Sequence, residues 1–224
     1  MSYSQPTYHS KTYREFKVIE AAAYRQIIHF YEKEAATIEA LEFEEHFEMT
    51  TAYVNALFEV GAYHKHLALV DSIIEAAITN NISFYKGEDV FLKMLFRKSA
   101  SLYNLFEYDQ AEYILREIIR INPWENDAVQ FLKKCLRSRQ PRYVQYARAA
   151  SIFLFLTAAL VIALEVLFIR SFYPEQSAAA EQTRLALFGL GGFILIGGDL
   201  FHRLRVEQHV NNFVHRIRRQ KDGL

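Results

Sequence analysis

The chain has 224 residues, and its 26 Lys and Arg balance its 26 Asp and Glu, so the formal net charge at pH 7 is zero. This balance hides a split: residues 1–132 hold 12 basic against 20 acidic residues, and residues 133–224 hold 14 against 6. Since the basic charge lies beside apolar segments, it suits anionic lipid, and we expect no nucleic acid partner. The one cysteine, Cys135, excludes an intrachain disulfide and a cysteine-rich zinc site.

The first residues predict a tail followed by helices. Residues 1–11 are polar, contain Pro6 and lack periodicity, which predicts a flexible tail. From Thr12, apolar residues recur at three-to-four spacing, as on one face of a helix. No Gly or Pro falls between Pro6 and Gly61, and one helix of that length is not expected in a globular domain, so we predict a break near Ala36–Leu41.

Two segments of similar pattern follow, Phe47–Thr79 and Leu92–Pro123. They align on Gly61-Ala-Tyr63 and on Phe106-Glu-Tyr108, and each predicts a helix of about 14 residues, a tight turn and a second helix. Between them, Thr79–Asp89 is predicted to be a loop, with Glu88 or Asp89 at the start of the next helix.

This pattern resembles the tetratricopeptide (TPR) family, whose units are helix-turn-helix repeats of about 34 residues. It departs from the family at Val54 and Ser99, which stand where Gly is usual, and at His66, which replaces Ala. The resemblance implies an all-α, TPR-like helical-repeat domain over residues 12–140. Two units cannot cover both outer faces, so the N-terminal helix and an amphipathic helix over 125–137 are expected to cap them.

The resemblance also implies a groove that holds a protein or peptide partner. By alignment, its lining residues come from the first helix of each unit: Thr51, Asn55, Phe58, Lys93, Arg97, Ala100 and Asn104. One TPR subclass holds the C-terminal carboxylate of a peptide with an Asn and a Lys/Arg pair, and Asn55, Lys93 and Arg97 fall at matching places. A different groove-bound partner and a merely solvated face are the alternatives.

Two apolar segments near the C-terminus predict a transmembrane α-helical hairpin over residues 141–201. Ala149–Ile169 has 21 residues and one charge, Glu165, and Leu185–Phe201 has 17 residues and one charge, Asp199. About 20 apolar residues span a bilayer core as a helix, and neither segment has the polar face of a soluble amphipathic helix.

Charge predicts the topology of this hairpin. Twelve basic residues flank the outer ends of the two spans, whereas only Arg170 and Arg184 lie in the connecting loop. The positive-inside rule therefore places both termini in the cytosol, and we expect an integral protein of a bacterial inner membrane. The start of the chain lacks the pattern of a signal peptide, so the soluble part should stay cytosolic. The basic, amphipathic residues 202–224 are expected either to lie on the membrane surface, with Leu204, Val210, Phe213, Val214 and Ile217 sharing a face, or to remain solvated.

The acids Glu165 and Asp199 are candidates for function because charges inside a membrane are costly. They should lie about 20 Å apart in depth, each beside a cation: Arg203 and Arg148 for Asp199, and Arg170 or Arg184 for Glu165. Ion pairing is the favoured interpretation, and a proton or ion path is the alternative. The small residues Gly189, Gly191, Gly192, Gly197 and Gly198, with Ala159 and Ala163, should pack the two helices together or form a homo-oligomer contact.

No motif in the sequence predicts catalysis, so we expect no enzyme activity and no cofactor. His64-Lys-His66 does not predict a metal site, because residues two apart on a helix point away from each other. The chain is thus expected to be a membrane-anchored adaptor, or scaffold, that binds a protein or peptide and anionic lipid at the cytosolic face. The alternative is an oligomeric membrane effector or ion-path protein with the TPR-like domain as its sensor.

Overall fold

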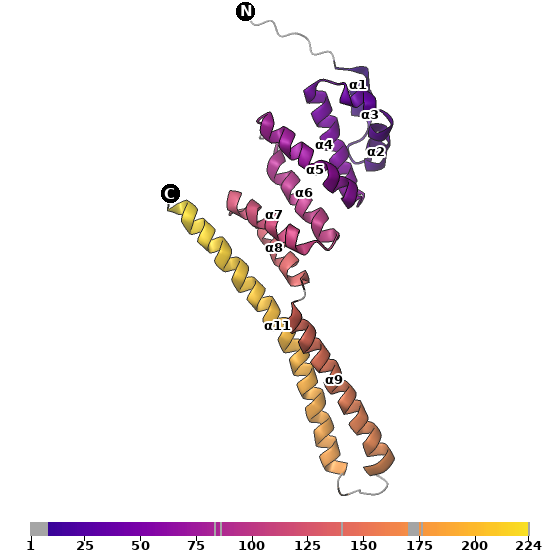
Figure 1. Ribbon diagram of the computed structural model, residues 1–224, viewed down its shortest axis with the longest axis vertical. Helices are drawn as coiled ribbons and strands as arrows, with labels where there is room; N and C mark the ends of the chain where they lie inside the picture. The colour runs from indigo at the N-terminus through magenta and orange to yellow at the C-terminus, as the bar shows by residue number, and fades with distance from the viewer. Residues whose placement is uncertain are drawn as a thin grey trace, which may run out of the picture. The chain divides into compact units, whose positions relative to one another are not determined.

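The computed structural model describes residues 9–82, 84–85, 87–139, 141–169, 175 and 177–223, which form an all-α chain apart from one two-stranded ladder (Figure 1). It divides into two compact units, residues 1–131 and 132–224. Most of the expected flexible tail, residues 1–8, lies outside the described residues. The domain limits expected from the sequence stay a prediction.

Unit 1 is a succession of helices in which each packs on its neighbours. α2 lies against α4, α4 against α5, α5 against α6, and α6 against α7. Such stacking buries the apolar face of each helix between two others. The helices are α1 (Lys11–Val18), α2 (Tyr24–Lys33), α3 (Ala35–Glu39), α4 (Phe43–Glu59), α5 (Tyr63–Thr79), α6 (Val90–Asn104), α7 (Tyr108–Ile121) and α8 (Asn126–Ser138), the last of which crosses into unit 2.

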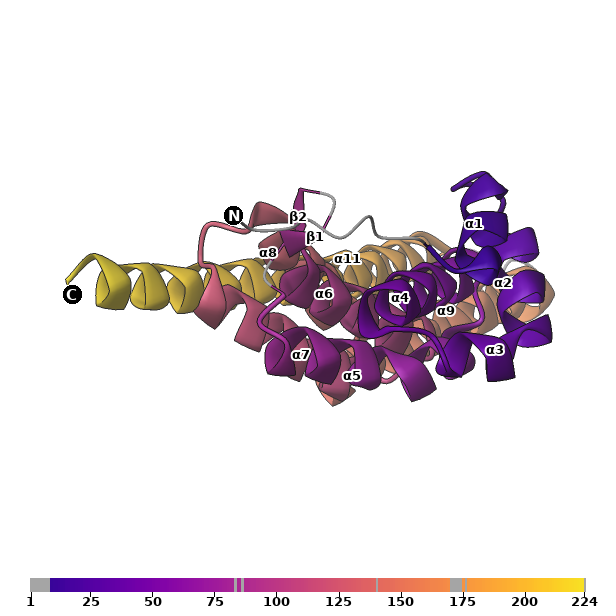
Figure 2. The same ribbon diagram turned by 90° about the horizontal axis from the view of Figure 1, so that it is seen from above.

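The N-terminal region has one break that the periodicity does not predict. The break near Ala36–Leu41 is confirmed, because α3 ends at Glu39 and α4 begins at Phe43. The chain also leaves the helix at Ile19, whose ψ is 128°, and resumes at Tyr24. This fold-back lets Phe16 of α1 and Ile27 of α2 reach one cluster with Met49 of α4, which one straight helix could not do. Figure 2 shows α1, α2 and α3 gathered at one end of α4.

The turns of the two helix pairs share one unusual backbone conformation. Gly61, between α4 and α5, has φ +78°, and Phe106, between α6 and α7, has φ +64°. These positions are equivalent in the sequence alignment. Glycine adopts this left-handed conformation without steric cost, whereas a side chain such as that of Phe106 is strained by roughly 1–2 kcal/mol.

The predicted loop before α6 contains a short antiparallel ladder that the sequence did not predict. β1 (Phe84–Tyr85) pairs with β2 (Glu88–Asp89), with Phe84 opposite Asp89. Gly87, with φ +82°, supplies the turn. Asp89 caps α6, since its Oδ1 accepts a hydrogen bond from the Leu92 amide at 2.9 Å, which confirms the helix start expected at Glu88 or Asp89.

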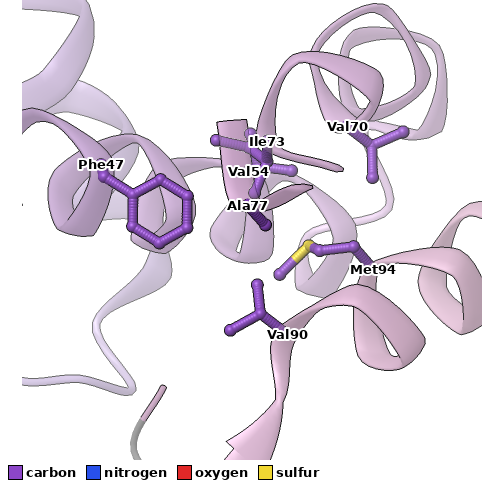
Figure 3. Close-up of a cluster of buried hydrophobic side chains, with 7 residues drawn as sticks. All are labelled: Phe47, Val54, Val70, Ile73, Ala77, Val90 and Met94. Carbon is purple, nitrogen blue, oxygen red and sulfur yellow. The ribbon is translucent and has the colours of Figure 1, made fainter. Parts of the chain in front are cut away.

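The core of unit 1 joins α4, α5 and α6. Figure 3 shows these buried side chains facing one another: Phe47, Val54, Val70, Ile73, Ala77, Val90 and Met94. Burying a side chain of this kind contributes about 1.5–3 kcal/mol each. The cluster therefore fixes α4 and α6, the two helices that carry the predicted groove residues, in one arrangement.

Unit 2 is dominated by two long helices that run side by side in opposite directions, α9 (Arg142–Leu164) with the π-helical turn η1 (Glu165–Ile169), and α11 (Ser177–Asp222) (Figure 1). Both helices are long and apolar enough to cross a membrane. Large apolar side chains such as Phe153, Leu156 and Phe193 are exposed on them. Of the connecting loop, residues 170–174 and 176 lie outside the described residues.

The two long helices meet along a narrow line of small side chains. On α9 and η1 the buried residues Val144, Ser151, Ala158 and Glu165 recur every seven positions, as along a coiled-coil seam. A Cβ built at Gly191 would lie 2.9 Å from the Phe155 ring, and one at Gly198 would lie 2.9 Å from the Ala147 Cβ. The expected glycine packing within the hairpin is confirmed at these two positions.

Ala159, Ala163 and three of the glycines do not pack the two described helices together, and their alternative role in a homo-oligomer contact stays a prediction. Ala159 and Ala163 are exposed, and Ala158 occupies the packed face instead. In the described part of the chain, nothing lies within 4 Å of a Cβ built at Gly189, Gly192 or Gly197. The seven-residue period of the seam selects one alanine and two glycines, so small size alone does not identify the packed face.

The residues that follow the second apolar segment, up to Asp222, continue α11 without a break. The sequence predicted that Leu204 shares a face with Val210 and Val214. In the structure Val210 and Val214 are buried, but Leu204 is exposed and Val206 takes its place on that face. The reason is geometric: Val206, Val210 and Val214 are spaced by four and share a face, whereas Leu204 lies six residues before Val210. The two expected states of this segment, on the membrane surface or solvated, stay predictions.

Candidate functional site

A cavity of about 560 Å³ lies in unit 1 between the α1–α2 connection, α4 and the start of α6. One wall is apolar and comes from the residues around Ile19 and Tyr24, and the other comes from Val90 and Met94. The unexpected fold-back at Ile19 forms the first wall, so the cavity depends on that break.

Two residues of α4 that line this cavity each hold a buried side-chain oxygen for which the described residues supply no hydrogen-bond partner. Thr51 is only 2% exposed, and its Oγ1 has no partner in the described part of the chain. The Oδ1 of Asn55, one helical turn further, is likewise buried and unpartnered there. A buried polar group without a partner costs about 1–3 kcal/mol, so an occupant that supplies hydrogen bonds here would recover that cost.

Charged side chains surround the same cavity. Lys17 of α1 forms an ion pair with Glu48 of α4, and the Tyr13 hydroxyl donates to the same carboxylate. The hydrogen bond to Glu48 raises the pKa of Lys17, which keeps that ammonium charged at neutral pH. Lys93 of α6 lines the other wall, and Glu20 lies at the α1–α2 connection. The cavity is therefore lined by two cations, Lys17 and Lys93.

The structure brings three of the predicted groove residues together, since Thr51, Asn55 and Lys93 all line the cavity. Phe58 and Arg97 form a separate cluster, in which the Arg97 guanidinium lies 5.0 Å from the Phe58 ring centroid. Arg97 also donates to Glu59 Oε1 at 2.9 Å and to the Asn55 carbonyl. Because Arg97 is engaged within the protein, it does not complete a carboxylate clamp with Asn55 and Lys93.

The remaining predicted positions lie away from the cavity. Asn104 is exposed, and its side-chain amide donates to the Ala100 carbonyl at 2.9 Å, while Ala100 itself is buried. Sequence reasoning missed Lys17, Glu48 and Tyr24. The N-terminal helices were expected only to cap the repeat. No Gly or Pro marks the position at which they fold back over α4.

The two acids of the hairpin are paired with arginines. Glu165 is 3% exposed, and its Oε2 lies 3.4 Å from Arg184 Nη1. Asp199 lies 3.0 Å from Arg203 Nε and 3.8 Å from Arg148 Nη2. The expected pairs with Arg184, Arg203 and Arg148 are confirmed, while Arg170 lies outside the described residues. The pairs sit at opposite ends of the hairpin, as the antiparallel arrangement requires.

Two of the remaining candidates for chemistry, His66 and Cys135, are buried. His66 is fully buried and its Nδ1 lies 2.9 Å from Ser101 Oγ, whereas His64 is exposed. Cys135 is also buried. The described residues contain no group of three or more His, Cys, Asp or Glu side chains placed to hold a metal ion.

A scan against protein-family models and searches of curated proteins and of solved structures give no significant match to this chain.

Proposed function

We propose that this chain is a membrane-anchored adaptor whose N-terminal, TPR-like domain holds a protein or peptide partner at the cytosolic membrane face. The observation that carries the proposal is the 560 Å³ cavity between α1–α2, α4 and α6, in which Thr51 and Asn55 present unpartnered polar atoms. Helix pairs of similar length, joined by turns with the same left-handed residue at Gly61 and Phe106, support the TPR-like assignment.

The chemistry of the cavity favours an extended peptide segment that inserts one apolar side chain. Ile19, Tyr24 and Met94 provide apolar contact, while Thr51 and Asn55 offer hydrogen bonds to a peptide backbone. Lys93, on the opposite wall, favours a neighbouring carboxylate in the partner. Apolar pockets with a few polar groups at their base fix the orientation of a ligand in this way.

The hairpin supplies the anchor. Both α9 and α11 are long and apolar enough to cross a bilayer, and the strong excess of basic residues outside the α9–α11 loop supports cytosolic termini, as in a bacterial inner membrane. Anchoring would confine the partner to a thin layer at the membrane and so raise its effective concentration there.

An oligomeric effector with an ion path has weaker support. Glu165 and Asp199 are each paired with arginine, and the pairs lie at opposite ends of the hairpin, so the acids do not line one path. Among the described atoms, a Cβ at Gly189, Gly192 or Gly197 would meet nothing within 4 Å, so these glycines leave room for a second copy, which is the feature that favours oligomers.

The test is proximity labelling by an enzyme fused to the N-terminus of the full chain in its native membrane. Thr51→Val with Asn55→Leu should reduce labelling of the specific partner about tenfold, since one or two hydrogen bonds of about 1 kcal/mol each are lost. Asn104→Leu is the matched control, because it removes an exposed amide outside the cavity. Unchanged labelling in the cavity variant would refute the site.

A further inference from the structure

A second hollow, of about 210 Å³, lies within unit 2 where α8 ends, α9 begins and α11 leaves its apolar stretch. We call it the junction pocket. One side consists of residues spaced three and four apart on α11: His202, Arg205, Val206 and His209. The other side consists of Leu136, Arg139, Pro141 and Tyr143.

The charged side chains that line the described part of the junction pocket are all basic. Arg139 and Arg205 line it, and the described lining contains no Asp or Glu. Glu207, two residues beyond Arg205, is engaged by Lys133 at 2.9 Å and by Arg137 at 3.3 Å. The acid nearest to Arg205 along the helix is therefore already neutralised, and the pocket presents a positive field to an occupant.

A buried polar atom gives an independent indication of a ligand. His202 is 8% exposed, and its Nδ1 lies 2.8 Å from the Tyr143 hydroxyl. Its Nε2 is buried and has no partner in the described part of the chain. When Tyr143 donates to Nδ1, Nε2 carries the ring proton and lacks an acceptor. An oxygen atom from a ligand would supply that acceptor.

The depth of the junction pocket matches lipid headgroups. His202 directly follows Phe201, the last residue of the apolar segment, and Arg205 lies about 6 Å further along the helix. The headgroup layer on each side of a bilayer is about 5–8 Å thick. Tyr143 precedes the other apolar segment, which begins at Ala149, by about 9 Å along α9, so the α9 side of the pocket lies at the outer edge of this layer.

We propose that the junction pocket binds the phosphate group of an anionic phospholipid, with Arg139 and Arg205 pairing with its charge and His202 Nε2 donating to one of its oxygens. Basic pockets beside membrane helices on the cytosolic side suit such headgroups. The proposal rests on the membrane anchoring proposed above. It assigns the lipid partner to one site, where charge alone would predict only diffuse attraction.

The test uses the full chain in a neutral detergent, titrated with dioleoyl phosphatidylglycerol and, separately, with dioleoyl phosphatidylcholine, and bound lipid is counted by native mass spectrometry. The wild type should retain one phosphatidylglycerol in preference to phosphatidylcholine. Arg139→Gln with Arg205→Gln should weaken retention by about fivefold for each arginine removed. His202→Gln should weaken it while both charges remain. The control, Arg216→Gln with Arg219→Gln, removes equal charge from exposed positions of α11 outside the pocket.

Three results would overturn the proposal: equal retention of phosphatidylcholine, equal losses in the pocket and control variants, and displacement of phosphatidylglycerol by millimolar inorganic phosphate, which would make a soluble anion the occupant. Extraction of native membranes with alkaline carbonate separates this from the proposed function. Release of the chain would refute the anchor itself, whereas an anchored chain without lipid preference would refute only the junction pocket.

Discussion

At the scale of single residues, His66 is a basic side chain placed where a proton is unfavourable. It is fully buried on α5, bonded through Nδ1 to Ser101 of α6. Burial, with a further contribution from the positive charge of Arg97, lowers its pKa to about 4. In the unfolded chain the same group titrates near 6.5. Between these two values the unfolded state binds the proton that the folded state excludes.

Stability of unit 1 should therefore fall as pH decreases from about 6.5 to 4, by a total on the order of 3 kcal/mol, and His66 should contribute no pH dependence above about 7. His66→Gln should flatten this part of the profile, because glutamine does not titrate. Denaturant unfolding followed by the fluorescence of Trp124, the one tryptophan, would measure it. The exposed His64→Gln serves as control, and a profile unchanged by His66→Gln would contradict the prediction.

Residue identity predicted the backbone conformation at one of the two helix-pair turns and not at the other. Gly61 was expected in a turn, and its φ of +78° agrees. Phe106 aligned with it, yet nothing in a phenylalanine predicts φ +64° for a side chain that is 77% exposed. The packing of α7 on α6 requires that turn, so tertiary structure imposes a local conformation that the residue alone disfavours.

At the scale of elements, the hairpin shows what apolar composition can and cannot predict. Composition identified two helices long enough to span a bilayer, as the structure has them. It could not identify their packed faces, because nearly every side chain is apolar and periodicity has no contrast. The choice of Ala159 and Ala163 failed for that reason. The seam follows a seven-residue period through Ser151 and Ala158.

Two adjacent glycines test this seam. Gly198→Ala should destabilise the hairpin by about 1–3 kcal/mol, since its Cβ would lie 2.9 Å from Ala147 Cβ, an atom fixed to the backbone. Gly197→Ala, which meets open space among the described atoms, should be neutral or slightly stabilising. Unfolding by SDS titration, followed by circular dichroism, would compare them. Equal effects of the two substitutions would show that the seam lies elsewhere.

The candidate cavity was predictable from the sequence only on one side. Alignment of the two helix pairs predicted Thr51, Asn55 and Lys93 as groove residues, and all three line the cavity. The wall around Ile19 and Tyr24 was not foreseen, because the segment before Ala36 has continuous helical periodicity and no Gly or Pro. Its break comes from the advantage of packing both α1 and α2 on α4, which is a long-range effect.

At the scale of the whole molecule, the charge split follows the division into units. The acidic excess falls in residues 1–132 and the basic excess in residues 133–224, close to the boundary of the compact units at 131 and 132. The sequence could therefore separate an acidic part from a basic part that holds the two apolar helices. It could not show that Arg139 shares a pocket with Arg205 and His202, since Arg139 lies just after α8, more than 60 residues before these two residues of α11.

The two arginine–carboxylate pairs also define the length of the uncharged stretch of helix between them. Arg148 and Glu165, one from each pair, are 17 positions apart on the same helical segment, or about 25 Å along its axis. The hydrocarbon core of a typical bilayer is about 30 Å thick, and mismatch costs a fraction of a kcal/mol per Å. The charged pairs thus delimit an apolar girdle shorter than the average membrane.

The reconstituted chain should accordingly co-float more completely with vesicles of 14-carbon lipids than with vesicles of 22-carbon lipids. Glu165→Leu with Arg184→Leu lengthens the girdle and should reduce that difference, whereas the conservative Arg184→Lys should keep it. Indifference of the wild type to chain length would contradict this. If it holds, bilayer thickness would govern which membranes retain the protein, independently of the headgroups they carry.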